Sequence, residues 1–158
     1  MKKFCLTSLF LFVTFLSFGQ RKNLSNPEPY FSAIIVNDIE RSITWYTKNF
    51  GLKVLNKTVS QERGFKQANL TSKGLLIELI EINASAQPNK LLEKYPKKTK
   101  IDGFFKFGFL VSNFDKWVTQ LKLNEVKFNG SVVTDNLTGK KMLLINDPDG
   151  NRIQLFEK

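Results

Sequence analysis

The chain is 158 residues long and strongly basic, with 24 lysine and arginine residues against 14 aspartate and glutamate residues. It contains no histidine, which removes the commonest acid/base group and metal ligand at neutral pH. A basic balance is compatible with nucleic acid, an anionic membrane or an anionic ligand as the partner.

The first twenty residues are typical of a secretory signal peptide. A basic MKK start precedes the apolar run LTSLFLFVTFLSF, and Ser17 and Gly19 are small residues at the cleavage positions. The run is shorter than the roughly 20 residues of a membrane-spanning helix, which argues against the alternative of a permanent anchor. We therefore expect residues 1–19 to be removed. The mature protein is then periplasmic or secreted, without membrane attachment and without nucleic acid as a partner.

The single cysteine, Cys5, precedes most of this apolar run, whereas a lipid-attachment cysteine would follow it at the cleavage point. Cleavage leaves the mature chain without a thiol, so no disulfide, lipid anchor or cysteine nucleophile is expected. After an N-terminal linker at 20–29, the remaining chain is long enough for one compact domain.

The first predicted unit begins with a strand-forming run at residues 30–36. Asn37 and Glu40 then form a pair like a capping box, and Gly51 ends the helix that they start. The apolar positions of this helix share one face: Ile39, Ile43, Tyr46 and Phe50. Three further strands are expected at residues 52–59, 64–70 and 74–82.

A linker is expected at residues 84–103. Its core, NKLLEKYPKKTKID, carries Pro96 and charges of both signs. This composition favours a solvated connection over a binding patch for an anionic partner.

The second predicted unit repeats the same order of elements. A strand at residues 104–111 is followed by Ser112 and Asp115 at capping spacing and by a helix that ends before Asn124. The apolar positions of this helix are Phe114, Trp117, Val118 and Leu121. Strands are expected at 125–132, 140–146 and 150–157, and Asp147-Pro148-Asp149-Gly150 between the last two is expected to be a tight turn and not a calcium loop.

The two units align as an internal duplication. Val36–Arg41 matches Val111–Lys116 at an offset of 75 residues, and GLLIELIE at Gly74–Glu81 matches GNRIQLFE at Gly150–Glu157 at an offset of 76. The fold class is therefore α+β, with two βαβββ modules at 30–83 and 104–158. Each helix covers one face of its sheet, and two such sheets side by side form a curved mixed-sheet saddle, which is a natural small-molecule site.

Two segments of the chain resemble the vicinal oxygen chelate superfamily of glyoxalases, fosfomycin- and bleomycin-resistance proteins and extradiol dioxygenases. They are IIVNDIERSITWYTKNFGLKV at Ile34–Val54 and INDPDGNRIQLFE at Ile145–Glu157. The resemblance extends from about Tyr30 to Glu157 and implies the fold of that superfamily. It also implies a divalent metal on the concave face, held by the first and last strands of each unit and acting as a Lewis acid.

Carried onto this chain, the four metal-ligand positions fall on Phe31, Glu78, Lys106 and Gln154. Phe31 has no lone pair, and the ammonium of Lys106 would repel a metal ion. At an effective dielectric constant near 20, a single positive charge about 4 Å from a divalent cation costs roughly 8 kcal/mol. One carboxylate and one amide do not make a tight site for zinc, nickel, iron or manganese. We therefore predict a chain without metal or cofactor.

In place of the metal, Lys106 is expected to pair with Glu78 across the floor of the saddle, with Gln154 hydrogen-bonded to one or both. Two interpretations remain open: a buried structural ion pair, or an ammonium that receives an anionic or carbonyl oxygen of a ligand. Glu78 would keep Lys106 charged, which argues against base or Schiff-base chemistry, and no catalytic residue is assigned.

Alternation along the strands selects the other side chains of that floor. The predicted ligand-binding set is Phe31, Glu78, Lys106, Gln154, Ile35, Ile80, Leu110, Arg152 and Phe156. An apolar floor around a charged centre suits an amphipathic or anionic small molecule, although core packing explains its apolar members equally well. Trp45, Tyr46 and Trp117 are expected to pack the helices against the sheets.

Three functions follow from these features. The first is an exported, non-catalytic protein that binds a small molecule in the saddle. The second is a metal-dependent enzyme of the glyoxalase, lyase or dioxygenase type, against which the missing ligands argue. The third is a module that uses the sheet face to form a homodimer or to dock a partner.

Overall fold

The computed structural model describes residues 29–86, 88–96, 99 and 103–158. The first module consists of β1 (Ser32–Val36), α1 (Ile39–Phe50), β2 (Lys53–Ser60), β3 (Phe65–Ser72) and β4 (Leu75–Ile82). The second consists of β5 (Phe107–Val111), α3 (Phe114–Leu123), β6 (Val133–Thr134), β7 (Lys141–Asn146) and β8 (Arg152–Glu157). The predicted signal peptide and nearly all of the linker at 20–29 lie outside the described residues.

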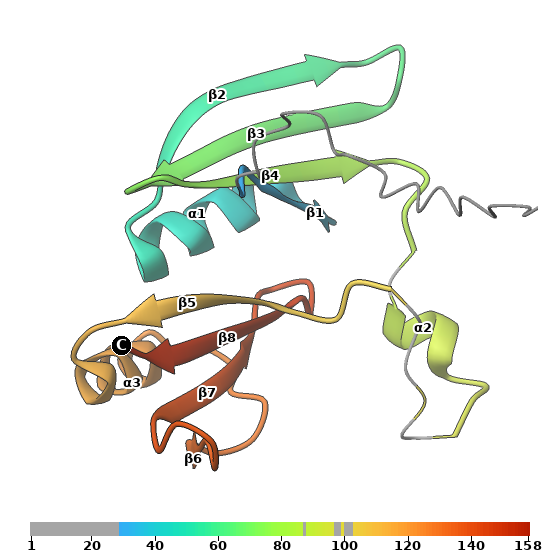
Figure 1. The fold of residues 1–158 in the computed structure, drawn as a ribbon. Coiled ribbons are helices and arrows are strands. Elements are labelled where there is room, and N and C mark those ends of the chain that lie inside the picture. Colours follow the sequence, from blue (N-terminus) through green and yellow to red (C-terminus); the bar gives the residue numbers. More distant parts are fainter. Residues whose placement is uncertain (1–28, 87, 97–98, 100–102) are drawn as a thin grey trace, which may run out of the picture.

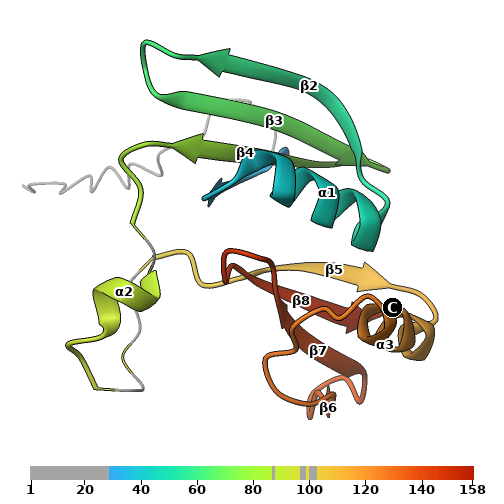
Figure 2. The same cartoon turned by 180° about the vertical axis from the view of Figure 1, so that it is seen from behind.

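The two modules have the same sheet topology. Their strand orders are β1-β4-β3-β2 and β5-β8-β7-β6, with one parallel pair in each sheet, β1 with β4 and β5 with β8. In Figures 1 and 2 the sheets lie one above the other, with the edge strands β1 and β5 on the sides that face each other. The predicted α+β fold of two βαβββ modules is confirmed.

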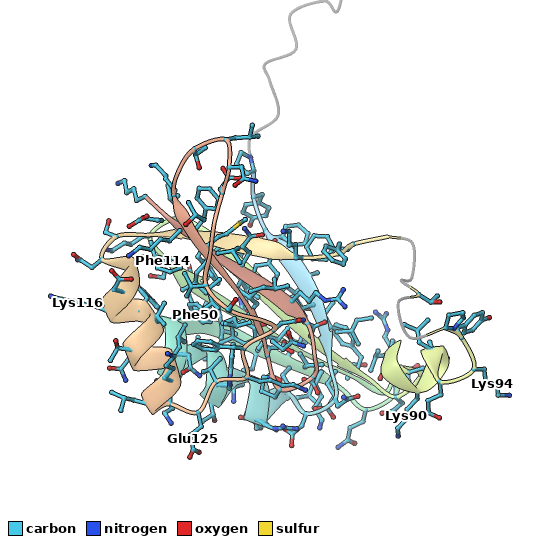
Figure 3. All side chains as sticks on the ribbon, turned by 90° about the horizontal axis from the view of Figure 1, so that it is seen from below. Phe50, Lys90, Lys94, Phe114, Lys116 and Glu125 are labelled. Atoms are coloured by element: carbon cyan, nitrogen blue, oxygen red, sulfur yellow. The ribbon has the colours of Figure 1, made fainter. Side chains whose placement is uncertain are left out.

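The predicted segment between the modules contains a short helix, α2 (Pro88–Leu92). Its first residue is a proline, which suits the first turn of a helix because the amide there has no partner within the helix. Figures 1 and 3 show α2 standing apart from both sheets. None of the helices in the described part of the chain has the length and apolar character needed to cross a membrane.

Helix α1 begins one residue later than predicted. The cap is Asp38 and not Asn37, and its side chain accepts a hydrogen bond from the backbone amide of Arg41 at 3.0 Å. Glu81, on the neighbouring strand β4, accepts a second one from the amide of Ile39 at 2.8 Å. Two of the amides that a helix start leaves unpaired are therefore satisfied, one locally and one through the tertiary structure.

Helix α3 begins without the predicted cap at Ser112. Asn113 precedes the helix in the left-handed region, with φ 58, and makes no side-chain cap hydrogen bond. The carboxylate of Asp115, which the capping box would have used, instead pairs with Lys141 at 2.7 Å. Helix α3 therefore starts from a backbone turn at Asn113, without a side-chain cap.

Among the predicted strands, the one at 125–132 differs most from the structure. The segment makes a single bridge, Phe128 to Ile145, and the strand β6 follows it at Val133–Thr134. Gly130 lies in this stretch with φ 101, a conformation that interrupts a strand. Strand β5 begins three residues later than the predicted strand at 104–111, and the remaining predicted strands agree with the structure to within two residues at either end.

The hydrophobic core lies between each sheet and its helix. Alternate strand residues point into it, as the period of two predicts. In the first module they are Ile34, Val36, Ala68, Leu70, Ile77 and Leu79, packed against α1; in the second they are Val111, Leu143, Ile145, Ile153 and Leu155, packed against α3. The remaining strand residues face away from the helices, and these are the positions that the predicted site uses.

The modules also contact each other through aromatic rings. Phe50, at the end of α1, packs against Phe109 of β5 with ring centroids 4.5 Å apart and stacks on Trp117 of α3 at 5.8 Å. Figure 3 shows Phe50 inside the molecule, whereas Lys116 and Glu125 point outward. Trp117 is also partly buried against the hydrophobic core, as expected of a residue that packs its helix against the sheet.

Candidate functional site

The two predicted last-strand positions occupy equivalent places in their sheets. Glu78 lies at the centre of β4 opposite Ala33 of β1, and Gln154 lies at the centre of β8 opposite Gly108 of β5. Both point away from the helices, because their strand neighbours are buried beneath α1 and α3. The two positions that align in the sequence duplication are therefore equivalent in the structure.

In the first sheet, Glu78 is engaged by a neighbouring strand. The side-chain amide of Gln67, on β3, donates a hydrogen bond to its carboxylate. Ile80 is half-buried on the same face. Phe31 and Ile35, at the edge of this sheet, are 54% and 56% exposed.

In the second sheet, the ammonium of Lys106 donates a hydrogen bond to the side-chain carbonyl of Gln154. The amide nitrogen of Gln154 in turn donates to the sulfur of Met142, at 3.0 Å. Two residues along β8, the guanidinium of Arg152 lies 4.6 Å from the ring centroid of Phe105. Leu110 on β5 is 63% exposed, and Phe156 on β8 is half-buried.

The predicted ion pair between Lys106 and Glu78 is wrong, although the expected hydrogen bond from Lys106 to Gln154 is present. Each group bonds within its own sheet, because facing side chains on neighbouring strands are only about 5 Å apart. Among the described residues the ion pairs are Lys57–Glu40, Lys66–Glu81 and Lys141–Asp115. The second sheet therefore presents two cations, Lys106 and Arg152, that take part in none of these pairs.

The four positions do not fit a divalent metal ion. Phe31 offers no donor atom, and Lys106 brings a positive charge. The carboxylate of Glu78 and the carbonyl of Gln154 are the oxygen donors, and each already accepts a hydrogen bond from a side chain. A divalent first-row metal bound by proteins takes four or more ligands, of which this set supplies two.

Gln67, Phe105 and Met142 were missed by the sequence reasoning. Gln67 could have been found from its place in the strand GFKQANL, because it alternates with the buried Ala68 and Leu70 on the other face. The pairing of β3 with β4 that brings it to Glu78 is set by the tertiary fold.

None of the nine predicted residues lines either of two cavities found among the described residues. One, of about 420 Å³, lies between α1 and the turn that precedes β8. The other, of about 230 Å³, lies at the hairpin that joins β2 and β3. The predicted residues instead cover the outer faces of the two sheets.

Comparison with known proteins places nearly all of the two-module region in one superfamily. The sequence model of the Glyoxalase/Bleomycin resistance protein/Dioxygenase superfamily matches residues 30–155. The uncharacterized protein YwkD of Bacillus subtilis (strain 168) is 29% identical over 126 residues, which are 80% of this chain and 93% of YwkD.

Solved structures agree with this placement at the level of the fold. The glyoxalase family protein of Enterococcus faecalis has a TM-score of 0.71 at 21% identity, covering 82% of this chain and 97% of its own. The trypanothione-dependent glyoxalase I of Leishmania major has a TM-score of 0.62 at 23% identity, covering 83% and 86%. At these identities the likeness shows the fold alone.

The matching region spans both modules up to Leu155 within β8, and it contains all nine predicted site residues except Phe156. The chain therefore belongs to the Glyoxalase/Bleomycin resistance protein/Dioxygenase superfamily, as the resemblance of its two motifs predicted.

Proposed function

We propose that this chain binds a small anionic, amphipathic molecule on the outer face of the second sheet, without a metal ion and without catalysis. The observation that carries the proposal is the pair of cations, Lys106 and Arg152, beside exposed apolar side chains.

The two cations suit a carboxylate or phosphate group. Lys106 has three N–H donors, and among the described residues it uses one of them, on Gln154, which leaves two for a ligand. The guanidinium carbon of Arg152 lies over the ring of Phe105, and this cation–π contact uses none of the N–H donors with which arginine binds an anion. Leu110 offers an apolar surface on the neighbouring strand for the rest of the molecule.

The proposal is tested by isothermal titration calorimetry with 2-naphthoate, a flat aromatic carboxylate. We expect Lys106→Gln/Arg152→Gln to weaken binding by at least about tenfold, because two charge-assisted hydrogen bonds are lost. Lys53→Gln/Lys122→Gln removes two exposed charges elsewhere and serves as the matched control. Equal affinity for the wild type and both variants would exclude this face as the site.

The absence of metal binding is tested separately. Purified protein is incubated with zinc, nickel, manganese or ferrous iron, and its metal content is measured with Glu78→Ala as the control. We expect no stoichiometric metal in either protein. Metal that binds the wild type and disappears in Glu78→Ala would contradict the proposal and favour the metal-dependent enzyme.

A second function is favoured by one observation: Ile35 and Leu110, on the edge strands β1 and β5, are 56% and 63% exposed. A second copy of the chain could cover these side chains in a homodimer. Sedimentation of the wild type and of Leu110→Glu separates the two functions. A dimer that dissociates in Leu110→Glu, with 2-naphthoate affinity unchanged, would assign this surface to assembly.

We also propose that the protein acts outside the cytoplasm, on the basis of the basic start and apolar run of residues 1–19. Expression of the full chain in a bacterium and N-terminal sequencing of the periplasmic product tests this. A product that begins at Gln20 is expected, and a product that keeps Met1 and remains in the cytoplasm would contradict it.

A further inference from the structure

We propose a second ligand site in the cavity between α1 and the turn before β8, suited to a small planar molecule with at least two negative charges. The cavity has a volume of about 420 Å³, within the range of small-molecule sites. This inference is independent of the function proposed above, since it uses none of the same residues.

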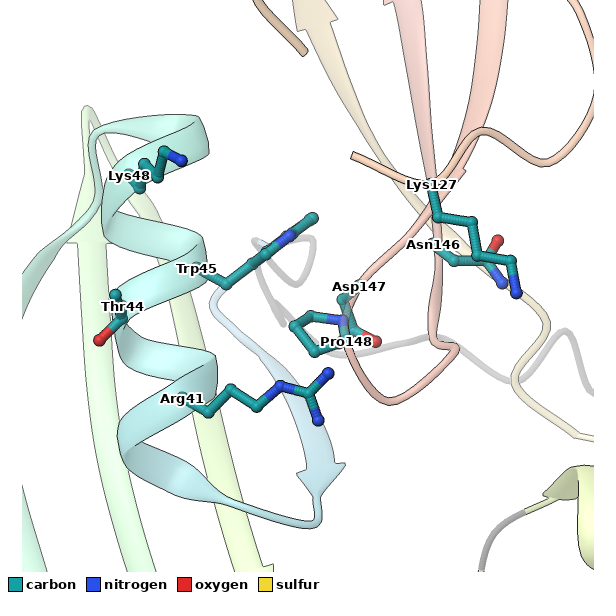
Figure 4. Close-up of a pocket in the computed structure, with 8 residues that line it drawn as sticks. All are labelled: Arg41, Thr44, Trp45, Lys48, Lys127, Asn146, Asp147 and Pro148. Carbon is teal, nitrogen blue, oxygen red and sulfur yellow. The ribbon is translucent and has the colours of Figure 1, made fainter. Parts of the chain in front are cut away.

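Both modules contribute to the walls of this cavity (Figure 4). Arg41, Trp45 and Lys48 come from α1, where their spacing of four and three residues places them on one face of the helix. In Figure 4 the side chains of Arg41 and Trp45 extend toward Pro148 of the second module, and Lys127 lies across the cavity. A ligand here would contact both halves of the molecule.

The charge of the lining favours an anion. Arg41, Lys48 and Lys127 are exposed, and none of them belongs to an ion pair found among the described residues. Two neutral polar groups of the lining already have partners within the protein. The hydroxyl of Thr44 donates to the Glu40 carbonyl at 2.9 Å, and the side-chain oxygen of Asn146 accepts from Asn129 at 3.1 Å.

The one carboxylate of the lining, Asp147, does not neutralise these cations through direct contacts. It is 4% exposed, and both of its oxygens accept hydrogen bonds from inside the molecule. One oxygen accepts from the backbone amides of Asp149 and Asn151, at 2.9 and 2.8 Å. The other accepts from the Tyr46 hydroxyl and the Asn151 side chain, both at 2.9 Å. Three positive charges thus line the cavity against one inward-turned negative charge.

The flat apolar part of the ligand is assigned to Trp45. Its indole is half-buried and is held by two aromatic neighbours, Tyr46 at 4.9 Å edge-on and Phe50 at 5.6 Å. An indole fixed in this way offers a stacking surface with little loss of side-chain entropy on binding. The combination of one such ring with three cations points to an aromatic or heteroaromatic phosphate, sulfonate or dicarboxylate.

The test uses 4-nitrophenyl phosphate, a planar dianion that quenches tryptophan fluorescence. The chain has two tryptophans, so Trp117→Phe leaves Trp45 as the single emitter. We expect saturable quenching with a dissociation constant below about 1 mM, weaker binding of inorganic phosphate, and no binding of uncharged 4-nitrobenzyl alcohol.

In the same background, Arg41→Gln/Lys127→Gln is expected to weaken binding by at least about tenfold. Lys116→Gln/Lys122→Gln removes two exposed charges from α3 and should leave the affinity within about twofold. Lys127→Glu provides a second disruptive variant, and circular dichroism confirms that each variant is folded.

Three results would overturn the inference: no quenching of Trp45, equal affinity in Arg41→Gln/Lys127→Gln and the control, or loss of quenching in Lys106→Gln/Arg152→Gln. The last result would move the ligand to the outer face of the second sheet. Failure of 2-naphthoate to bind that face would leave the present inference unaffected, so the two proposals fail separately.

Discussion

Asp147 connects the turn before β8 to α1, because its carboxylate accepts a hydrogen bond from the hydroxyl of Tyr46. Burial raises the pKa of this carboxyl group, while hydrogen bonds from Asn151, Tyr46 and the amide of Asp149 act in the opposite direction. Burial and the charge of Asp147 together raise the pKa of Tyr46 well above its usual value. The phenol is therefore a permanent donor to the carboxylate at neutral pH.

We predict that Tyr46→Phe lowers the free energy of unfolding by about 1–3 kcal/mol, because it leaves a buried carboxylate with one donor fewer. Urea denaturation measures this loss. Tyr95→Phe is the control, since Tyr95 is 60% exposed and should tolerate the change. An equal effect of the two substitutions would show that the Tyr46–Asp147 hydrogen bond contributes nothing specific.

Glu81 is a second residue whose charge depends on the fold. The hydrogen bond from Lys66 and then that from the amide of Ile39 lower the pKa of this carboxyl group. A lowered pKa in the folded state means that Glu81 contributes stability above its unfolded pKa, and that this contribution is lost as the pH falls through the folded pKa.

The difference in unfolding free energy between the wild type and Glu81→Gln should therefore be largest near neutral pH and shrink toward about pH 3. Denaturation at several pH values measures it. Glu40→Gln is the matched control, because the Glu40 side chain is 68% exposed in its pair with Lys57 and such pairs contribute little. A difference that does not vary with pH would contradict the role given to Glu81.

At the level of the elements, β5 and β8 leave no room for a side chain where Gly108 lies opposite Gln154. A Cβ atom at Gly108 would lie 2.9 Å from the backbone oxygen of Gln154, a separation that requires one of the strands to shift. The equivalent position in the first sheet is Ala33, which already carries a Cβ atom. The two modules therefore differ in strand packing at the position of the proposed site.

We predict that Gly108→Ala lowers the free energy of unfolding by about 1–3 kcal/mol through this overpacking. It should also weaken 2-naphthoate binding, because Gln154 orients Lys106. Ala33→Gly is the reciprocal change and should cost only about 0.5–1 kcal/mol, from backbone entropy. If Gly108→Ala proves as stable as the wild type, the close approach of the two strands is not a constraint.

Across the whole molecule, the modules are joined by the ring of Phe50 and by hydrogen bonds to the turn before β8. Asp149 accepts from the side chains of Asn37 and Ser42, at 2.8 and 3.1 Å. The side chain of Asn124, at the end of α3, donates to that of Asn49 at 2.9 Å. Polar and aromatic contacts thus connect two halves that each have a core of their own.

A double-mutant cycle of Phe50→Leu and Phe109→Leu measures how much the aromatic contact contributes to the association of the two modules. We predict a coupling energy of about 0.5–1.5 kcal/mol in the unfolding free energy, as for other paired rings in contact. Phe50→Leu with Phe104→Leu is the control pair, since Phe104 is 74% exposed and its ring contact is with Phe107. Equal coupling in the two cycles would show that the ring contact does not join the modules.

The amino-acid sequence by itself determined the two-module fold. The two offset repeats and the period of two in the strands can both be recognised in the sequence. So can Gly51, which ends α1 in the left-handed conformation with φ 64. Local backbone preference and apolar patterning are enough to produce these elements. The same alternation placed Glu78, Lys106, Gln154 and Arg152 on the faces turned away from the helices, because side-chain direction along a strand has a fixed period.

Tertiary structure alone decided which partner each polar group takes. Glu78 bonds to Gln67 and not to Lys106, Asp38 replaces Asn37 as the cap, and Asp147 meets Tyr46 from the other module. These partners come from strands, turns and helices that only pairing and packing bring together. The energies that choose between them depend on distances of a few ångströms, which periodicity in a sequence does not specify.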